Sequence, residues 1–433
     1  MSTHAQSPNE PTPSGFLAAW TRLLGPRGVP TLDTRRGRKP RVPLSQVLSA
    51  LTFHVMQDTG TLAEHLFQLF RTPLTDSAWS DRRVRLPWDI FAELMRRALR
   101  PRATRRQHRA AFWRGWRLVG LDGTQFSLIN TPQVAATVAK ARTRRGRAGF
   151  AKITTAVLLE IGLHNPLAAG IGRRGESEWA LAQRLLAQIP KGALLLADRL
   201  YGVTAFARAA QTTCQRVGSH FLLRASRAVK PRLLRRLRDG TRLVVLSGAI
   251  EVREIRVRVG RRGHRTHELR LWTSLLDPRT APARELAQVY ASRWEHEGYF
   301  REIKRQLRRS ALLQSHTVET GAQEIAAIVL ASAVIAEERA RAATAQIPAL
   351  RISFGQILHV VRGMWLFFGP FDDVFTDPQK TRVIRRGRAL IRRHLIAPRR
   401  PRTCPRAVRQ PVTKWPRLLK PQSIQAPWVL QLV

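Results

Sequence analysis

The sequence predicts a mixed α/β protein in which a helical N-terminal part precedes a series of strands and a late, charged helix. Apolar residues recur at three- and four-residue steps in Leu44–Met56 and Leu62–Phe70, the period of a helix buried on one side. Lys152–Ile161 and Ala193–Ala197 are short runs of apolar or β-branched residues, which predicts strands. Polar and apolar residues alternate around 253–259 and 267–274, which predicts strands with one solvated face.

The other expected elements lie between and after these runs. Strands are expected at Leu167–Gly172 and His220–Ala225, with an amphipathic helix at Glu176–Ile189. Helices are also expected at Gly321–Ala342 and Phe354–Phe367. The apolar run Ile325–Ala336 is too short to span a bilayer and is bounded by carboxylates, so we expect a buried helix and no membrane partner.

Composition points to a polyanionic partner. The chain has 433 residues, with 75 Lys and Arg against 29 Asp and Glu, a formal net charge of +46. This excess runs through the whole chain, as expected for a protein that binds nucleic acid. The polar, Pro-rich residues Met1–Gly15 contain no signal peptide, so we expect a cytoplasmic location.

Few residues point to a structural metal site. The two cysteines, Cys214 and Cys404, are far apart, so neither a disulfide framework nor a zinc site is expected. His264 and His267 form H-x-x-H, but no second ligand pair is nearby. Trp272 could stack on a nucleobase, although packing is the commoner use of a tryptophan in a strand.

The stretch Tyr290–Lys304 has the most specific pattern. Four polar side chains fall within about 60° of one another on a helix with about 100° per residue: Tyr290, Arg293, Glu297 and Lys304. Apolar or aromatic positions beside this stripe are expected to face the core: Val289, Trp294 and Phe300. A carboxylate among these cations suits a metal ligand flanked by phosphate-binding groups. A surface ion pair between Arg293 and Glu297 is the alternative.

Two aspartates follow strand-like residues upstream. Asp122 lies in Trp116–Ile129, which is expected to form two strands meeting at a turn or bulge at Asp122-Gly123. Such an acid can be a metal ligand, or simply part of a hairpin turn. Asp198 ends the buried strand Ala193–Ala197, where a metal ligand and a helix cap for Val203–Ala210 are the alternatives.

The spacing Y-x2-R-x3-E-x6-K in residues 290–304 resembles the signature of DDE transposases of the insertion-sequence-four family. Asp122-Gly123-Thr124 resembles that family's first motif, and Asp198-Arg199 with Tyr201 its second. The resemblance implies a ribonuclease H-like catalytic domain with a mixed sheet flanked by helices. It implies that Asp122, Asp198 and Glu297 are the catalytic, metal-binding acids, and that Tyr290, Arg293 and Lys304 contact the DNA backbone.

The resemblance also implies the partners and the reaction. We expect two Mg²⁺ ions, with Mn²⁺ as a substitute, and cut-and-paste transposition by an activated water followed by 3′-hydroxyl strand transfer. The expected partners are double-stranded DNA, as inverted-repeat ends and target, and a second copy of the chain in a homodimer on paired ends. In a bacterial cytoplasm such a protein would associate with the nucleoid. The alternatives are a transposase-derived DNA-binding protein that no longer cleaves and a basic RNA-associated factor.

These expectations divide the chain into six segments. The predicted helix Leu62–Phe70 and a short helix over Trp79 and Arg82, which Pro87 ends, resemble a helix-turn-helix, with Arg82 and Arg83 exposed for DNA binding. The expected segments are a disordered tail (1–15), a helical DNA-binding domain (16–110), a catalytic core in two parts (111–226 and 281–350), a β-rich insertion (227–280) and a C-terminal helical and basic region (351–433).

Overall fold

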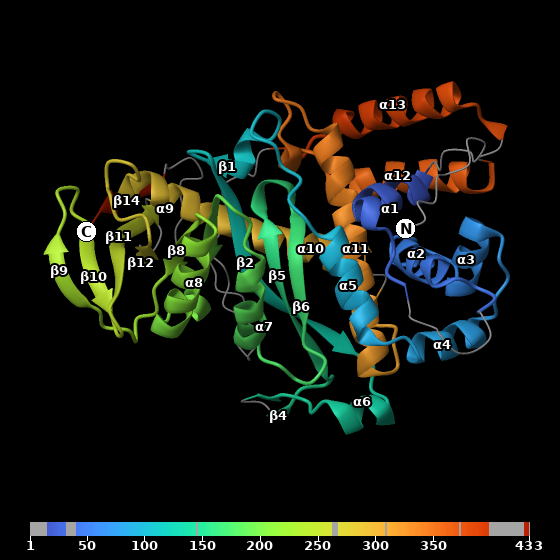
Figure 1. The fold of residues 1–433 in the computed structure, drawn as a ribbon, viewed down its shortest axis with the longest axis horizontal. Helices are drawn as coiled ribbons and strands as arrows, with labels where there is room; N and C mark the ends of the chain where they lie inside the picture. Colours follow the sequence, from blue (N-terminus) through green and yellow to red (C-terminus); the bar gives the residue numbers. More distant parts are fainter. Residues whose placement is uncertain are drawn as a thin grey trace, which may run out of the picture. The chain divides into compact units, whose positions relative to one another are not determined.

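The computed structural model describes residues 15–31, 40–143, 146–261, 267–307, 310–371, 374–397 and 428–432. The predicted tail, apart from Gly15, lies outside these ranges, as do His264 and Cys404. The chain forms two compact units, which we describe separately (Figure 1). The first contains Met1–Pro190 and Trp294–Ile396, and the second contains Lys191–Arg293 and Ala397–Val433. Both combine helices with strands, which confirms the predicted mixed α/β class.

The first unit is mainly helical. Its α-helices are α1 (Gly15–Leu24), α2 (Leu44–His54), α3 (Leu62–Phe70), α4 (Asp76–Val84), α5 (Trp88–Ala98), α6 (Pro132–Thr137), α7 (Glu178–Leu185), α10 (Glu295–Glu302), α11 (Val318–Ala342), α12 (Phe354–Phe371) and α13 (Asp377–Arg393). Short 3-10 turns are η1 (Gly25–Arg27), η2 (Arg109–Ala111), η3 (Ile161–Leu163), η4 (Leu186–Gln188) and η8 (Ala349–Arg351), and η7 (Ile303–Leu307) is a π-helical turn.

One sheet lies among these helices. Its central strands are β2 (Trp116–Leu128), β5 (Lys152–Glu160) and β6 (Asn165–Ile171), which pair antiparallel in the order β6-β5-β2. β1 (Phe112–Trp113) and β13 (Leu312–Leu313) also pair with β2, and β3 (Arg142–Thr143) pairs with β4 (Gly146–Arg147) in a separate ribbon. Helix α7 packs against all three central strands.

Helix α11 forms the centre of the first unit's core. It contacts α1, α2, α5, α12 and β6, and its residues from Ile325 to Ile335 are buried. Among the described residues it is the one helix long and apolar enough to cross a membrane, yet 94% of its apolar window is buried inside the protein. This burial is that of a core helix and confirms the predicted buried helix.

The second unit has a sheet flanked by α8 (Thr204–Arg216), α9 (Ala283–Ala291) and the 3-10 turn η5 (Arg199–Tyr201). The strand order is β7-β8-β12-β11-β10-β9 (Figure 1). The strands are β7 (Ala193–Ala197), β8 (His220–Arg224), β9 (Arg232–Arg236), β10 (Arg242–Leu246), β11 (Ile250–Arg261) and β12 (His267–Thr273). β7 and β8 are parallel and the other pairs antiparallel. β14 (Trp428–Leu432) pairs with the end of β11 that β10 leaves open.

The compact units differ from the six predicted segments. Helices α1 to α5 share one continuous hydrophobic core with α11 and α12, so they do not form a separate helical domain. β9 to β12 fall within the range predicted as a β-rich insertion, but they extend the sheet that begins with β7 and β8. No local pattern in the sequence predicts β9, β10 or β14.

Candidate active site

Asp122 lies in the middle of a continuous strand. β2 pairs with β5 without a register shift from Val119 opposite Glu160 to Ser127 opposite Lys152. The predicted break at Asp122-Gly123 is therefore wrong, because Asp122 and Gly123 both have strand partners, Val157 and Ala156. Gly123 serves instead for close packing, since a Cβ there would lie 2.2 Å from the Glu178 side chain on α7.

Helix α10 and turn η7 run along the other face of β2. Side chains on a strand alternate between faces, so Gly120, Asp122 and Phe126 share the face opposite to that of Gly123. A Cβ on Gly120 would lie 2.7 Å from His296 Nδ1 on α10. Lys304 Nζ lies 5.4 Å from the centre of the Phe126 ring. Asp122 is therefore on the face that α10 and η7 cover, between their two contacts with β2.

Glu297 follows His296 on α10 and is exposed, whereas His296 is fully buried. The contact between His296 and Gly120 brings the helical turn that carries Glu297 onto the Asp122 face of β2. Lys304 is half-buried at the other end of the same contact. The first unit thus packs α10 and η7, which carry Glu297 and Lys304, against the face of β2 that carries Asp122.

A buried ion network fixes α10. His164 Nδ1 bonds to Glu302 Oε2 (2.7 Å) and His164 Nε2 to Glu295 Oε2 (3.2 Å), so one imidazole joins carboxylates on both sides of Glu297. Arg339 of α11 donates to Glu302 Oε1 at 2.8 Å. Tyr299 Oη also lies 3.0 Å from Ser332 Oγ of α11. These bonds fix both the rotation and the position of α10 against η3 and α11.

The network changes the proton affinities of its members. Burial alone would raise the pKa of Glu302, but Arg339 and His164 outweigh burial and lower it to about 2. Burial alone would lower the pKa of His164, but Glu302 and Glu295 outweigh it, so this pKa is raised. When His164 is protonated, the ionised Glu302 therefore lies between two cations, His164 and Arg339.

Asp198 belongs to the second unit and directly follows the buried strand β7. It does not cap α8, which begins at Thr204 with Val203 at its N-cap, so the helix-cap alternative is wrong. Arg224 Nη1 lies 3.6 Å from Asp198 Oδ1. Gly202 allows the chain to pass close to the end of β8 here, since a Cβ on it would lie 1.8 Å from the Arg224 carbonyl oxygen.

Tyr290 and Arg293 are also in the second unit, and both are buried. The Tyr290 hydroxyl donates to the carbonyl oxygen of Ala197, the residue before Asp198, at 3.4 Å. Burial raises the pKa of the Tyr290 phenol well above its ordinary value. The phenol is therefore protonated at neutral pH and acts here as a donor that links α9 to the end of β7.

The predicted single helix for residues 290–304 is wrong in detail. The stretch consists of the end of α9, the 3-10 turn η6 (Ser292–Trp294), α10 and the π-helical turn η7. Changes of helical pitch rotate the side chains, so the calculated stripe does not hold throughout. Trp294, predicted to face the core, is 44% exposed, whereas Phe300 is buried as predicted.

The donor set fits a hard divalent cation. Carboxylate oxygens are the ligands that Mg²⁺ and Mn²⁺ prefer. Asp198 Oδ1 is buried and has no hydrogen-bond partner among the described residues, which a bound cation would correct. Within those same residues, no three His, Cys, Asp or Glu side chains form a metal-binding group. The predicted ligands are divided between the units, with Asp122 and Glu297 on the first and Asp198 on the second.

Comparison with known proteins gives the family. The profile described as "Transposase DDE domain" matches residues 117–333, half of the chain. The chain belongs to the DDE transposase family. It is 28% identical over 231 residues to the transposase InsG for insertion sequence element IS4 of Escherichia coli strain K12. The aligned residues make up 51% of this chain and 51% of InsG. The chain thus spans about half the length of this curated relative.

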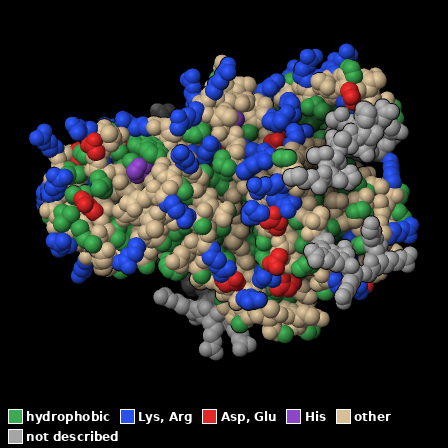
Figure 2. All heavy atoms as spheres, in the orientation of Figure 1, with side chains coloured by type: hydrophobic (Ala, Val, Ile, Leu, Met, Phe, Trp, Pro, Cys, Tyr) green, Lys and Arg blue, Asp and Glu red, His purple; other side chains and the backbone are tan. Residues whose placement is uncertain are grey.

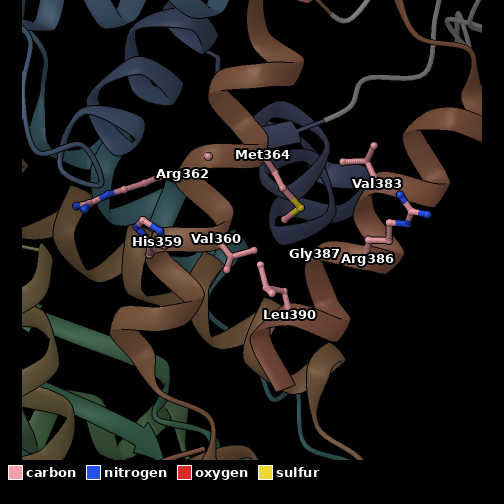
Figure 3. A pocket seen from close by; sticks show the side chains of 9 residues that line it. His359, Val360, Arg362, Met364, Val383, Arg386, Gly387 and Leu390 are labelled. Carbon is pink, nitrogen blue, oxygen red and sulfur yellow. The ribbon is translucent and has the colours of Figure 1, made fainter. Parts of the chain in front are cut away.

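The matched part of this DDE family member contains all three predicted acids and the four residues of the 290–304 pattern. An open hollow of about 620 Å³ between α12 and α13 lies beyond the matched part. Val360 and Met364 of α12 and Leu390 of α13 line it, with no carboxylate among its lining residues (Figure 3). It is unsuited to metal-dependent chemistry.

Trp272 is fully buried and donates to Glu254, which confirms the packing interpretation.

Arg82 and Arg83, the two predicted DNA contacts of α4, have different surroundings. Arg83 donates to the Thr320 carbonyl oxygen (2.9 Å) and Ser315 Oγ (3.2 Å), and so holds α4 against the start of α11. Burial lowers the pKa of Arg83. Burial also lowers the pKa of the neighbouring Arg82, which is half-exposed. The structure gives Arg83 an internal role, and we keep the prediction of DNA contact for Arg82.

These surroundings predict opposite effects of two adjacent substitutions. Arg82→Ala should leave the free energy of unfolding within about 0.5 kcal/mol of wild type and reduce the slope of log K against log salt for duplex DNA by about 0.9. Arg83→Ala should lower the free energy of unfolding by about 1–3 kcal/mol, because it removes the hydrogen bonds that hold α4 against the start of α11. Urea denaturation and fluorescence anisotropy measure the two quantities. The reverse pattern would show that Arg83 is the DNA contact.

Proposed function

We propose that the chain is an active transposase that cleaves DNA at the ends of a mobile element and joins the freed 3′-hydroxyl to target DNA. The proposal is supported by the packing of α10, the helix that carries Glu297, against the face of β2 that carries Asp122. A chain that only bound DNA would need neither these two acids on packed elements nor the buried network behind α10. Membership of the DDE transposase family supports the same conclusion.

In this proposal Asp122, Asp198 and Glu297 hold Mg²⁺ or Mn²⁺. Bound ions would supply Lewis acidity, both to the attacking water and to the leaving 3′-oxygen. Lys304, on the Asp122 face, would bind a phosphate next to the cleaved bond. Tyr290, protonated and donating to Ala197, would position Asp198 and would not act as a nucleophile. Arg293, which is buried just after the end of α9, would contribute positive charge to the DNA-binding side of the second unit.

The partners follow from the same proposal. Double-stranded DNA is the substrate, first as inverted-repeat ends and then as target. We propose that two copies of the chain act together on paired ends, in the cytoplasm with the nucleoid. The high positive charge suits this, and Figure 2 shows Lys and Arg side chains over much of the visible face, with few Asp and Glu.

The test is metal-dependent release of 3′ ends. The purified chain is incubated with linear DNA that carries the sequences bounding its gene, with Mg²⁺ or with a chelator, and new 3′-hydroxyl ends are mapped by primer extension. We expect cleavage at the element boundary with Mg²⁺ and none with chelator. Specific binding of these ends without cleavage in either Mg²⁺ or Mn²⁺ would favour the non-cleaving DNA-binding protein.

A further inference from the structure

The sheet of the second unit carries a trough lined by cations. Two hollows, of about 180 and 380 Å³, share Arg256 and Arg270 in their walls and are therefore adjacent. We call their combined lining the arginine trough. It contains seven Lys or Arg and two Glu residues. One end includes Arg224, whose Nη1 lies 3.6 Å from Asp198 Oδ1, and the other includes Lys230 and Arg242.

The middle of the trough holds two arginines directly opposite each other. Arg256 of β11 pairs with Arg270 of β12, so their side chains are on the same face. Like charges in this position repel unless a counter-charge is present. The carboxylate of Glu254, which is 1% exposed, lies 2.8 Å from Arg256 Nε and 3.7 Å from Arg270 Nε. Glu254 and Glu268 are the two carboxylates of the trough, against seven Lys and Arg, so the trough keeps a net positive charge.

These contacts fix the guanidinium groups before any ligand binds. Arg270 Nη2 donates to the carbonyl oxygens of Ser226 and Val229. The Arg270 guanidinium also lies 5.5 Å from the centre of the Trp272 ring, and Trp272 Nε1 donates to Glu254. Arg256 remains about one-third exposed in the trough, and Arg227 at its wall is exposed. Preorganised cations bind an anion at a lower entropic cost than flexible surface lysines.

We propose that the arginine trough binds the phosphodiester backbone of double-stranded DNA as a site of its own, leading away from Asp198. The proposal rests on the proposed function for the identity of the partner. An extended row of cations matches successive phosphates better than it matches a single small anion. The tryptophan at its centre is buried beneath the arginines, so no base-stacking surface is offered there, and binding should be independent of sequence.

The experiment measures DNA binding without cleavage. The full chain, in chelator, is titrated into a labelled duplex of about 30 base pairs and of unrelated sequence, at several salt concentrations. Each of Arg227→Gln and Arg256→Gln should reduce the slope of log K against log salt by about 0.9, and the double variant by about twice that. Arg256→Lys keeps the charge and should keep the wild-type slope. Arg279→Gln, at a 92% exposed arginine of the same unit outside the trough, should also keep it.

Several results would overturn the proposal. The first is a salt slope for DNA binding that stays unchanged in the double variant. The second is an equal reduction of this slope in Arg279→Gln. The third, measured with a duplex RNA of the same length, is a loss of affinity for the RNA without a loss for the DNA. Thermal melting checks that each variant is folded. If Arg256→Gln melts early, the exposed Arg227→Gln alone decides, with Arg279→Gln as its control.

Cleavage is measured separately. If wild type cleaves element ends but the double variant keeps the wild-type salt slope, the trough proposal fails and the proposed function stands. If the slopes fall as expected but wild type never releases 3′ ends, the proposed function fails and the trough remains a DNA-binding site. With both correct, the double variant should cleave at the wild-type rate at saturating DNA and need more DNA to reach half of that rate.

Discussion

Each of Asp122→Asn, Asp198→Asn and Glu297→Gln is expected to reduce metal-dependent release of 3′ ends by at least about 10³-fold, since each removes a charged metal ligand worth several kcal/mol in the transition state. Binding of the duplex in chelator should stay close to wild type, because none of the three removes a cation. Gel analysis of end-labelled DNA measures the first quantity and anisotropy the second.

Glu319→Gln is the matched control. Glu319 is an exposed carboxylate of the first unit, paired with Arg173 at 2.7 Å, and is not one of the proposed ligands. Its loss should leave cleavage unchanged. If any of the three ligand variants still cleaves at a rate within tenfold of wild type, that residue is not a metal ligand. If cleavage falls together with DNA binding, the variant has damaged the fold rather than the chemistry.

Glu302→Gln is expected to lower the free energy of unfolding by about 3–5 kcal/mol at pH 6, because it leaves the buried Arg339 without its counter-charge. Since Glu302 anchors α10, cleavage should also fall, and the Mg²⁺ concentration for half-maximal rate should rise as Glu297 loses its fixed position. Urea denaturation and a Mg²⁺ titration measure the two effects. Glu93→Gln is the control, because Glu93 pairs with Arg96 and Arg97 near the surface and should cost at most about 1 kcal/mol.

The stability that the network contributes should depend on pH at both ends. The pKa of Glu302 is lowered from 4.5 to about 2, so its contribution is complete above pH 4.5 and is lost as the pH falls towards 2. The pKa of His164 is raised, so its contribution is complete below its ordinary value of 6.5 and is lost as the pH rises through the raised value. The difference in stability between wild type and Glu302→Gln should therefore be largest between about pH 4.5 and 6.5. A difference that does not vary with pH would show that the pair is not ionised.

Local patterns predicted most of the helices and strands, but not how the proposed site residues are held. The runs that became β7, α3 and α11 carry their structure in their own periodicity. Asp122-Gly123 has the composition of a turn, and only pairing with β5 makes it the middle of a strand. β5 lies about thirty residues further along the chain, so the residues around Asp122 do not reveal that it pairs with them. The predicted break therefore followed only the local composition.

The support behind α10 had no signal in the sequence either. His164, Glu302 and Arg339 meet from three distant segments, and each alone looks like an ordinary surface residue. Similarly, β9 and β14 are strands because β10 and β11 pair with them, although β9 has the sequence RLLRR. What the sequence did predict was the family, through a resemblance that the family match then confirmed, and the identity of the three acids stays a prediction.

The central position of α11 has a consequence for how the polypeptide emerges from the ribosome. Helices α1, α2 and α5 bury their apolar sides against a segment that is translated more than two hundred residues later. Until Ala342 has left the exit tunnel, those sides have no native surface to cover them, and a nascent chain of this kind is prone to aggregation or chaperone capture. Messages truncated before α11 should therefore yield insoluble fragments rather than a working N-terminal domain.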